Sequence, residues 1–222
     1  MAHIDFVSKL HKKTARNYLE RVCEHDKIEC ATVAKQYGKD YWDGDRRYGY
    51  GGYLYDGRWE VVARDMIQHY GLRSGQKILD VGCGKAFLLY EFKKLLPGLE
   101  VRGIDISNYG LENAKEDVRE FLINAPAQQI PFEDNEFDLV YSLATLHNLK
   151  IFDLIKAISE INRVLKDPTK AYIMLESYRN EAERVNLLYW QLTCESFYSV
   201  DEWEWVYQKF GYKGDYSFIY FE

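Results

Sequence analysis

Short apolar runs alternate with amphipathic stretches through the middle of the chain. Such runs are typical of strands buried on both faces of a parallel sheet, and apolar residues spaced three or four apart are typical of the helices that cover it. The predicted strands lie at residues 78–81, 100–107, 122–124, 139–142 and 171–177, and the predicted helices at 58–72, 87–96, 111–121 and 151–165. This alternation predicts an α/β fold, with a doubly wound, mostly parallel sheet and helices on both faces.

The two ends of the chain are less regular. A loose apolar stripe predicts a helix over residues 5–24, whose basic residues suit a solvated face. The last third contains two further predicted helices, at 181–192 and 201–210, and a closing strand within 215–222. We therefore expect an N-terminal helical and aromatic cap over residues 1–57 and the α/β core over residues 58–222.

Residues 40–59 have an unusual composition, with seven aromatic residues and five glycines. Glycines permit turns, and tyrosines supply flat stacking faces with polar tips. The segment is expected to be neither helix nor regular strand. It could be a lid over a polar ligand, or an ordered loop that packs its tyrosines on the core, and the sequence leaves both interpretations open.

Residues 77–92, reading KILDVGCGKAFLLYEF, predict a strand that turns through Gly-Cys-Gly directly into a helix. Glycines at such a turn let the backbone approach a ligand at the carboxyl ends of the strands. The dinucleotide motif GxGxxG fails because Phe87 stands at its third glycine. The phosphate-binding motif GxxxxGK[ST] fails because Ala86 follows Gly84-Lys85 and Leu79 replaces the first glycine.

The spacing agrees better with a ligand that contains adenosine but places no phosphate at this turn. Asp105 lies 21 residues beyond Gly84, at the end of the second predicted strand. An acidic side chain at this position can accept hydrogen bonds from both ribose hydroxyls.

Composition narrows the function classes. With 222 residues the chain suits one domain with a sizeable core, and a net charge of −6 argues against a nucleic-acid partner. The four cysteines form no CxxC pair and no metal-ligand spacing, so we expect reduced thiols and no metal site. No run approaches the ~20 apolar residues of a membrane span, and lysines occur where a signal peptide needs an apolar core. We expect a cytoplasmic protein without a membrane segment.

The motifs LDVGCGKA, GIDIS, IPFEDNEFDLV and LHNL occur in this order between residues 70 and 177. This series resembles the class I S-adenosylmethionine-dependent methyltransferases of the small-molecule type. The resemblance implies S-adenosylmethionine as cofactor and S-adenosylhomocysteine as product. It implies that Gly82, Cys83 and Gly84 line the methionine and ribose part of the cofactor, and that Asp80 orients the glycine turn and the cofactor's amino group. Asp105 would hold the ribose, and Ile106 would lie against the adenine.

The chain departs from the family pattern at two positions. Ala86 stands where the family usually has a third glycine, and Pro126 stands where an Asp or Asn often receives the adenine amino group. The adenine edge would then depend on backbone atoms near Ala127 and on Gln128. The family fold usually ends in a strand hairpin, whereas residues after Phe210 leave room for one clear strand. The sheet edge is therefore expected to be shortened or completed by a partner subunit, as in a homodimer.

On the acceptor side, His147 is the best candidate for a general base, because it follows the fourth strand and a histidine pKa suits this role. The alternative is a histidine that packs at the entry of the next helix. Glu176 and Tyr178 follow the fifth strand and could orient the acceptor or serve as surface or capping residues. Tyr53 and Arg58 could meet the acceptor or the cofactor carboxylate, although an arginine beside a tryptophan often only packs on it.

These observations predict an S-adenosylmethionine-dependent methyltransferase that acts on a small polar metabolite by O- or N-methylation. Two alternatives remain open: methylation of a protein side chain, and a non-catalytic protein that binds an adenosyl ligand on the same fold. A nicotinamide oxidoreductase is disfavoured by Phe87.

Overall fold

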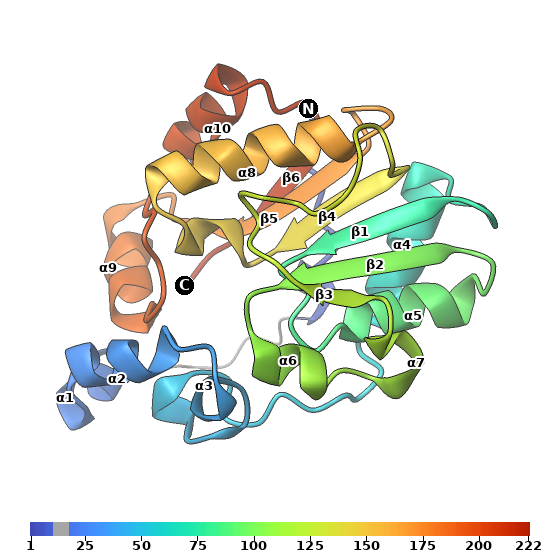
Figure 1. Ribbon diagram of the computed structural model, residues 1–222. Helices are drawn as coiled ribbons and strands as arrows, with labels where there is room; N and C mark the ends of the chain where they lie inside the picture. The colour runs from blue at the N-terminus through green and yellow to red at the C-terminus, as the bar shows by residue number, and fades with distance from the viewer. Residues whose placement is uncertain (11–17) are drawn as a thin grey trace.

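The computed structural model describes residues 1–10 and 18–222 (Figure 1). Its centre is a six-stranded sheet in the order β3-β2-β1-β4-β5-β6, and every described pair of neighbouring strands is parallel. The strands are β1 (Lys77–Val81), β2 (Glu100–Asp105), β3 (Leu122–Asn124), β4 (Leu139–Leu143), β5 (Ala171–Glu176) and β6 (Asp215–Ile219). The sequence-based expectation of a doubly wound parallel sheet is confirmed.

Helices cover both faces of the sheet, as Figure 1 shows. One face packs on α4 (Glu60–Tyr70) and α5 (Phe87–Leu95), and the opposite face packs on α8 (Ile151–Val164) and α10 (Val200–Lys209). Successive residues of a strand point to opposite faces, so Ile78 belongs to one hydrophobic core and Leu79 to the other. Because both faces are buried, the sequences of the central strands β1, β4 and β5 are almost continuously apolar.

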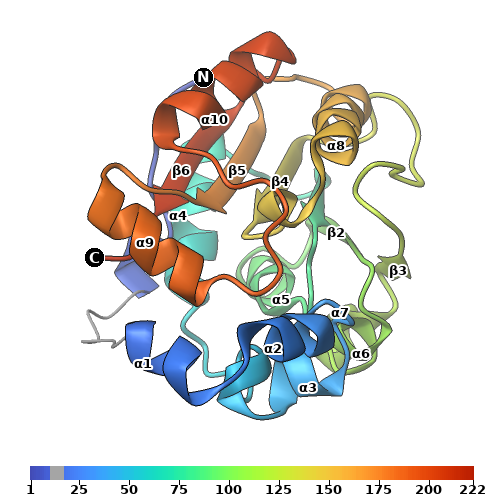
Figure 2. The same ribbon diagram turned by 90° about the vertical axis from the view of Figure 1, so that its left-hand side faces the viewer.

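The order of the strands reverses direction between β1 and β4, since β2 and β3 lie on one side of β1 and β5 and β6 lie beyond β4. In open α/β sheets a ligand binds at the carboxyl ends of the strands beside such a switch point. Four helices lie near these ends in Figures 1 and 2: α1 (Tyr18–Glu24), α2 (Lys27–Ala34), α3 (Lys39–Asp43) and α9 (Glu181–Trp190).

The β6 edge of the sheet is covered by the beginning of the chain. The Tyr216 N–H donates to the Ala2 carbonyl at 3.0 Å, and the Ile4 N–H donates to the Tyr216 carbonyl at 2.9 Å. His3 thereby forms a parallel bridge with Tyr216. The predicted single closing strand is present, and part of its outer edge is paired within the chain.

Two predicted helices differ in the structure. The helix expected over 111–121 is two short helices, α6 (Asn108–Glu112) and α7 (Glu116–Arg119). The helix breaks before α7, because Lys115 has a non-helical backbone with φ of −57° and ψ of 133°.

The helix expected over 5–24 does not begin at residue 5, because the Asp5 side chain accepts the N–H groups of Val7 and Ser8 in a turn. A 3-10 helix, η1 (Ser8–Leu10), follows this turn, and the part of the expected helix at 11–17 lies outside the described residues.

Residues 40–59 also contain more helix than expected, since they hold most of α3 and the 3-10 helix η2 (Arg46–Tyr48). After β4 a third 3-10 helix, η3 (Leu146–Asn148), leads toward α8. Among the described helices, none combines the length and the apolar character that crossing a bilayer requires.

Candidate active site

The turn after β1 is held against the end of β2. The N–H groups of Gly82 and Cys83 both donate to the Ile104 carbonyl, at 2.8 and 3.0 Å. Gly82 and Gly84 adopt φ values of 87° and 52°, which residues with a side chain rarely adopt. A Cβ at Gly82 would lie 2.1 Å from Thr145 Oγ1. Glycine is therefore required at this turn, because the backbone has positive φ and because Thr145 leaves no room for a Cβ at Gly82.

Asp105, at the carboxyl end of β2, fixes the same turn from the other side. Its Oδ2 accepts the Gly84 N–H and its Oδ1 accepts the Ser107 N–H, both at 2.7 Å. Burial raises the pKa of Asp105, and these N–H groups oppose the rise. A carboxylate has about four lone-pair sites, so each oxygen keeps capacity to accept a hydroxyl of a ligand.

Asp80, in β1, is a buried carboxylate with 5% exposure. Burial raises its pKa well above the ordinary value; the Tyr141 side chain opposes the shift, and the Asp105 charge adds to it. Among the described residues no lysine, arginine or histidine forms an ion pair with it. A buried carboxylate is costly to ionise without a countercharge, so this position favours a cationic group of a ligand.

A cavity of about 1040 Å³ opens beside the glycine turn. It is lined by residues from β1, β4, β5, α9 and the aromatic segment near residue 50. Eight of the residues singled out in the sequence contribute to its wall: Asp80, Gly82, Cys83, Gly84, His147, Tyr53, Arg58 and Glu176. The structure thus brings the proposed methionine end of the cofactor site and the proposed acceptor residues into one space.

His147 lies in this cavity wall with 3% exposure. Its Nε2 is 3.4 Å from Gln191 Nε2 and 3.9 Å from Glu176 Oε2, the latter too long for a hydrogen bond. Its Nδ1 has no hydrogen-bond partner among the described residues. Burial lowers the pKa of His147 to about 4. The imidazole is therefore neutral near pH 7 and able to accept a proton.

Five predicted site residues lie outside the cavity lining: Asp105, Ile106, Ala127, Gln128 and Tyr178. Asp105 ends β2 and Ile106 follows it, whereas Ala127 and Gln128 follow β3. Gln128 Oε1 is buried without a hydrogen-bond partner in the described part of the chain. The Tyr178 ring stacks on Phe197, with centroids 5.3 Å apart. Arg58 lines the cavity, but its Nε donates to Asp56 Oδ2 at 2.7 Å.

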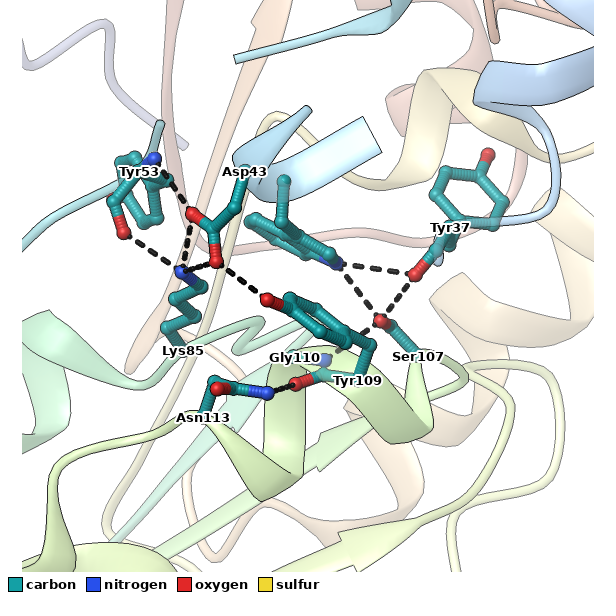
Figure 3. Close-up of polar contacts among 9 residues, drawn as sticks. Tyr37, Asp43, Tyr53, Lys85, Ser107, Tyr109, Gly110 and Asn113 are labelled. Atoms are coloured by element: carbon teal, nitrogen blue, oxygen red, sulfur yellow. Dashed lines mark hydrogen bonds and ion pairs between the residues drawn. The ribbon is translucent and has the colours of Figure 1, made fainter. Parts of the chain in front are cut away.

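Sequence reasoning missed the residues that fasten the aromatic segment to the glycine turn. Lys85 Nζ lies 2.7 and 2.6 Å from the two carboxylate oxygens of Asp43 and donates to the Tyr53 carbonyl at 3.0 Å (Figure 3). Tyr109 donates to the same carboxylate at 2.8 Å. The charges and aromatic residues in 40–59 were the only signal, because these contacts join positions 32 to 66 residues apart.

Comparisons with known proteins agree with this geometry. Residues 79–173 match the family model described as a methyltransferase domain. A demethylmenaquinone methyltransferase of Staphylococcus aureus is 33% identical over 162 residues, and the match covers 67% of this chain and 66% of that relative.

Among solved structures, the YcgJ protein of Bacillus subtilis aligns with a TM-score of 0.56 at 22% identity, covering 67% of this chain and 66% of that one. A SAM-dependent methyltransferase of Aquifex aeolicus aligns with a TM-score of 0.52 at 23% identity, covering 67% and 78%. At these identities the two structures support the fold.

The first prediction concerns Ala86, which begins α5 with φ of 53°. This left-handed conformation costs a residue with a side chain roughly 1–2 kcal/mol, whereas glycine adopts it freely. Glycine also costs about 0.5–1 kcal/mol of entropy, and the lost methyl group of the buried Ala86 costs about 0.8 kcal/mol. Ala86→Gly should therefore leave the free energy of unfolding nearly unchanged, measured by urea denaturation. The matched control Ala157→Gly, inside α8, has no strain to relieve and should lose about 1 kcal/mol or more. An equal loss in the two variants would contradict the proposed strain.

The second prediction concerns the pH dependence of stability at Asp80. Because burial raises its pKa, the folded state binds more protons than the unfolded state between pH 3.8 and the folded pKa. The contribution of Asp80 to stability therefore falls as pH rises through this window, by at most about 1.4 kcal/mol per pH unit. Asp80→Asn should become increasingly stable relative to the unchanged protein as urea denaturation is repeated from pH 5 to pH 8. A constant difference would show that Asp80 binds the same number of protons in the folded and unfolded states over this range, and so that burial does not raise its pKa into this range.

Proposed function

The chain belongs to the class I S-adenosylmethionine-dependent methyltransferase superfamily, and from this premise we propose that it transfers a methyl group from S-adenosylmethionine to a small polar molecule, by O- or N-methylation. The observation that carries the proposal is the single cavity shared by the glycine turn and by His147 and Glu176. A methyltransferase must hold a donor and an acceptor in contact, and this cavity borders both sets of residues.

The described residues fit the donor. The buried carboxylate of Asp80, without a cationic partner among them, suits the donor's ammonium group. Asp105 has lone pairs for the ribose hydroxyls, and Ile106, 54% exposed, offers apolar surface to the adenine. The unpartnered Gln128 Oε1 suits the adenine amino group, with backbone atoms of Ala127 beside it. These two residues would replace the acidic or amide side chain that Pro126 lacks.

When bound, the donor supplies an electrophilic methyl group, so the protein mainly has to align the acceptor. Alignment within ~3–3.5 Å can supply several kcal/mol of the barrier. Neutral His147 would accept the proton that a hydroxyl or ammonium acceptor loses. Glu176, close to His147, would orient the acceptor by accepting one of its hydrogen bonds. Tyr53 and Arg58, which line the same cavity, would limit the space for the acceptor.

A second candidate acceptor follows from the relative that acts on demethylmenaquinone. The observation that favours it is the aromatic character of the cavity wall, to which the side chains of Tyr50, Trp59, Trp190 and Phe221 contribute. Flat rings of this kind can stack on a quinone-type ring. A panel of acceptors should therefore contain hydroxylated metabolites, amines and a demethylated naphthoquinol.

Donor binding is tested directly by isothermal titration with S-adenosylhomocysteine. We expect the unchanged protein to bind it and Asp105→Ala to bind about ten- to a hundredfold more weakly, because a charged acceptor of ribose hydrogen bonds is lost. Thermal unfolding of the variant shows whether it is folded at the titration temperature. Unchanged affinity would contradict the ribose assignment. Binding of a nicotinamide dinucleotide in place of S-adenosylhomocysteine would contradict the function.

Catalysis by His147 is tested by the formation of S-adenosylhomocysteine in the presence of each acceptor. His147→Ala should lower kcat about a hundredfold or more, with little change in the affinity for S-adenosylhomocysteine. Because the pKa of His147 is lowered to about 4, its basic form is already complete near pH 6, and kcat should show no rise centred on pH 6.5. The surface variant His69→Ala is the control. Full turnover by His147→Ala would make His147 a packing residue.

A further inference from the structure

Residues 37–53, here called the aromatic cap, pack directly on the glycine turn. A Cβ at Gly84 would lie 2.5 Å from Cη2 of Trp42, so the indole ring occupies the space beside the bare Cα of Gly84. The Trp42 Nε1–H donates to Ser107 Oγ at 2.8 Å and to the Tyr37 carbonyl at 3.2 Å. Trp42 therefore extends from Gly84 to Ser107, the two residues whose N–H groups bind the Asp105 carboxylate.

The position of Trp42 divides the proposed donor site into two halves. Asp80 and Gly84 line the cavity, and Trp42 lines it with them, whereas Asp105 does not. A donor that places its ammonium group at Asp80 and its ribose at Asp105 has to pass Gly84. Because the indole covers Gly84, such a donor must contact Trp42.

The neighbouring residue Asp43 holds this arrangement in place. The side chain of Lys85, one residue beyond Gly84, is only 4% exposed, and Asp43 is its ion-pair partner. Asp43 Oδ1 also accepts the Tyr53 N–H at 3.1 Å. Moving Asp43 away would leave the buried charge of Lys85 uncompensated, so the ion pair resists displacement of the cap from the glycine turn.

The cap continues from Trp42 to the acceptor side of the cavity. The Tyr50 ring stacks on Trp42 with centroids 5.1 Å apart and an interplanar angle of 1°. Tyr50 lines the cavity and keeps 39% of its surface exposed. Glu176 lines the same cavity, so the stacked pair connects Gly84 to the space that borders the proposed acceptor residues.

We propose that Trp42 is an additional donor-binding residue, contributed by the aromatic cap, and that the ion pair between the buried Lys85 and Asp43 positions it against Gly84. This assignment rests on the proposed function, because it places Trp42 at the junction of the two halves of the same donor site. Trp42 binds the donor by contact, whereas Lys85 and Asp43 act through it and are positioning residues.

The experiment titrates S-adenosylhomocysteine into the full chain and records intrinsic tryptophan fluorescence and calorimetric affinity. The test variants are Trp42→Phe, which keeps an aromatic ring and removes the hydrogen bond to Ser107, and Asp43→Asn, which neutralises the ion pair. The matched controls are Trp205→Phe, at an exposed tryptophan of α10, and Glu60→Gln, in an exposed ion pair with Lys94. Thermal unfolding of every variant identifies a temperature at which all are folded.

We expect ligand to change the fluorescence of the unchanged protein and of both controls. Trp42→Phe should lose most of this change and bind about tenfold more weakly, because the smaller ring makes less contact with the donor and is no longer held in position by Ser107. Asp43→Asn should also bind more weakly while keeping Trp42 as the reporter. Asp43→Asn therefore tests the inference if Trp42→Phe fails to fold.

Two results would overturn the inference. If the unchanged protein binds the ligand while Trp42→Phe, or Asp43→Asn in its place, keeps full affinity despite a lower melting temperature, the cap is only packed there and the proposed function stands. If the unchanged protein does not bind S-adenosylhomocysteine, the proposed function falls and the inference falls with it.

Discussion

The hydrogen bonds from the Gly84 and Ser107 N–H groups to the Asp105 carboxylate are the constraint on which the site depends. They join the turn after β1 to the turn after β2, and therefore fix the relative positions of two strand ends and two helix starts. Ser107 Oγ caps the N-terminus of α6 by accepting the Gly110 N–H, and it also accepts the indole N–H of Trp42. The Asp105 carboxylate thus holds the backbone of the site, including the N–H of Ser107. The Ser107 hydroxyl in turn anchors the aromatic cap through Trp42.

Backbone strain is concentrated around this site. Four non-glycine residues in the described part of the chain have positive φ, and three of them border the site: Tyr37, Ala86 and Ala144. Tyr37 supplies a carbonyl to Trp42 and Ser107, Ala86 begins α5, and Ala144 lines the cavity after β4. Each conformation costs of order 1–3 kcal/mol and persists only where the surrounding contacts determine it. The packing of the aromatic cap and the hydrogen bonds between the strands supply the contacts that hold these three conformations.

Periodicity and motif spacing were sufficient to predict the sheet, because each strand of a parallel α/β sheet is a local apolar run. β3, for example, was predicted with the bounds observed. The break between α6 and α7 was missed because it lies in the backbone conformation of Lys115, a residue whose type does not by itself predict a helix end. The roles of Trp42 and Lys85 could not be predicted, since their partners lie 65 and 42 residues away.

The pairing of Ala2 and Ile4 with Tyr216 has a consequence for self-association. An uncovered parallel edge is a template for another strand, but here the chain's own first residues already take up hydrogen-bonding groups of β6. Two copies that joined along this edge would have to exchange these segments, replacing each intramolecular pairing by an identical intermolecular one, as in domain swapping. Such an exchange gains no new backbone bonds at this position, so the balance between monomer and swapped dimer would be set by protein concentration and by the freedom of the connecting chain.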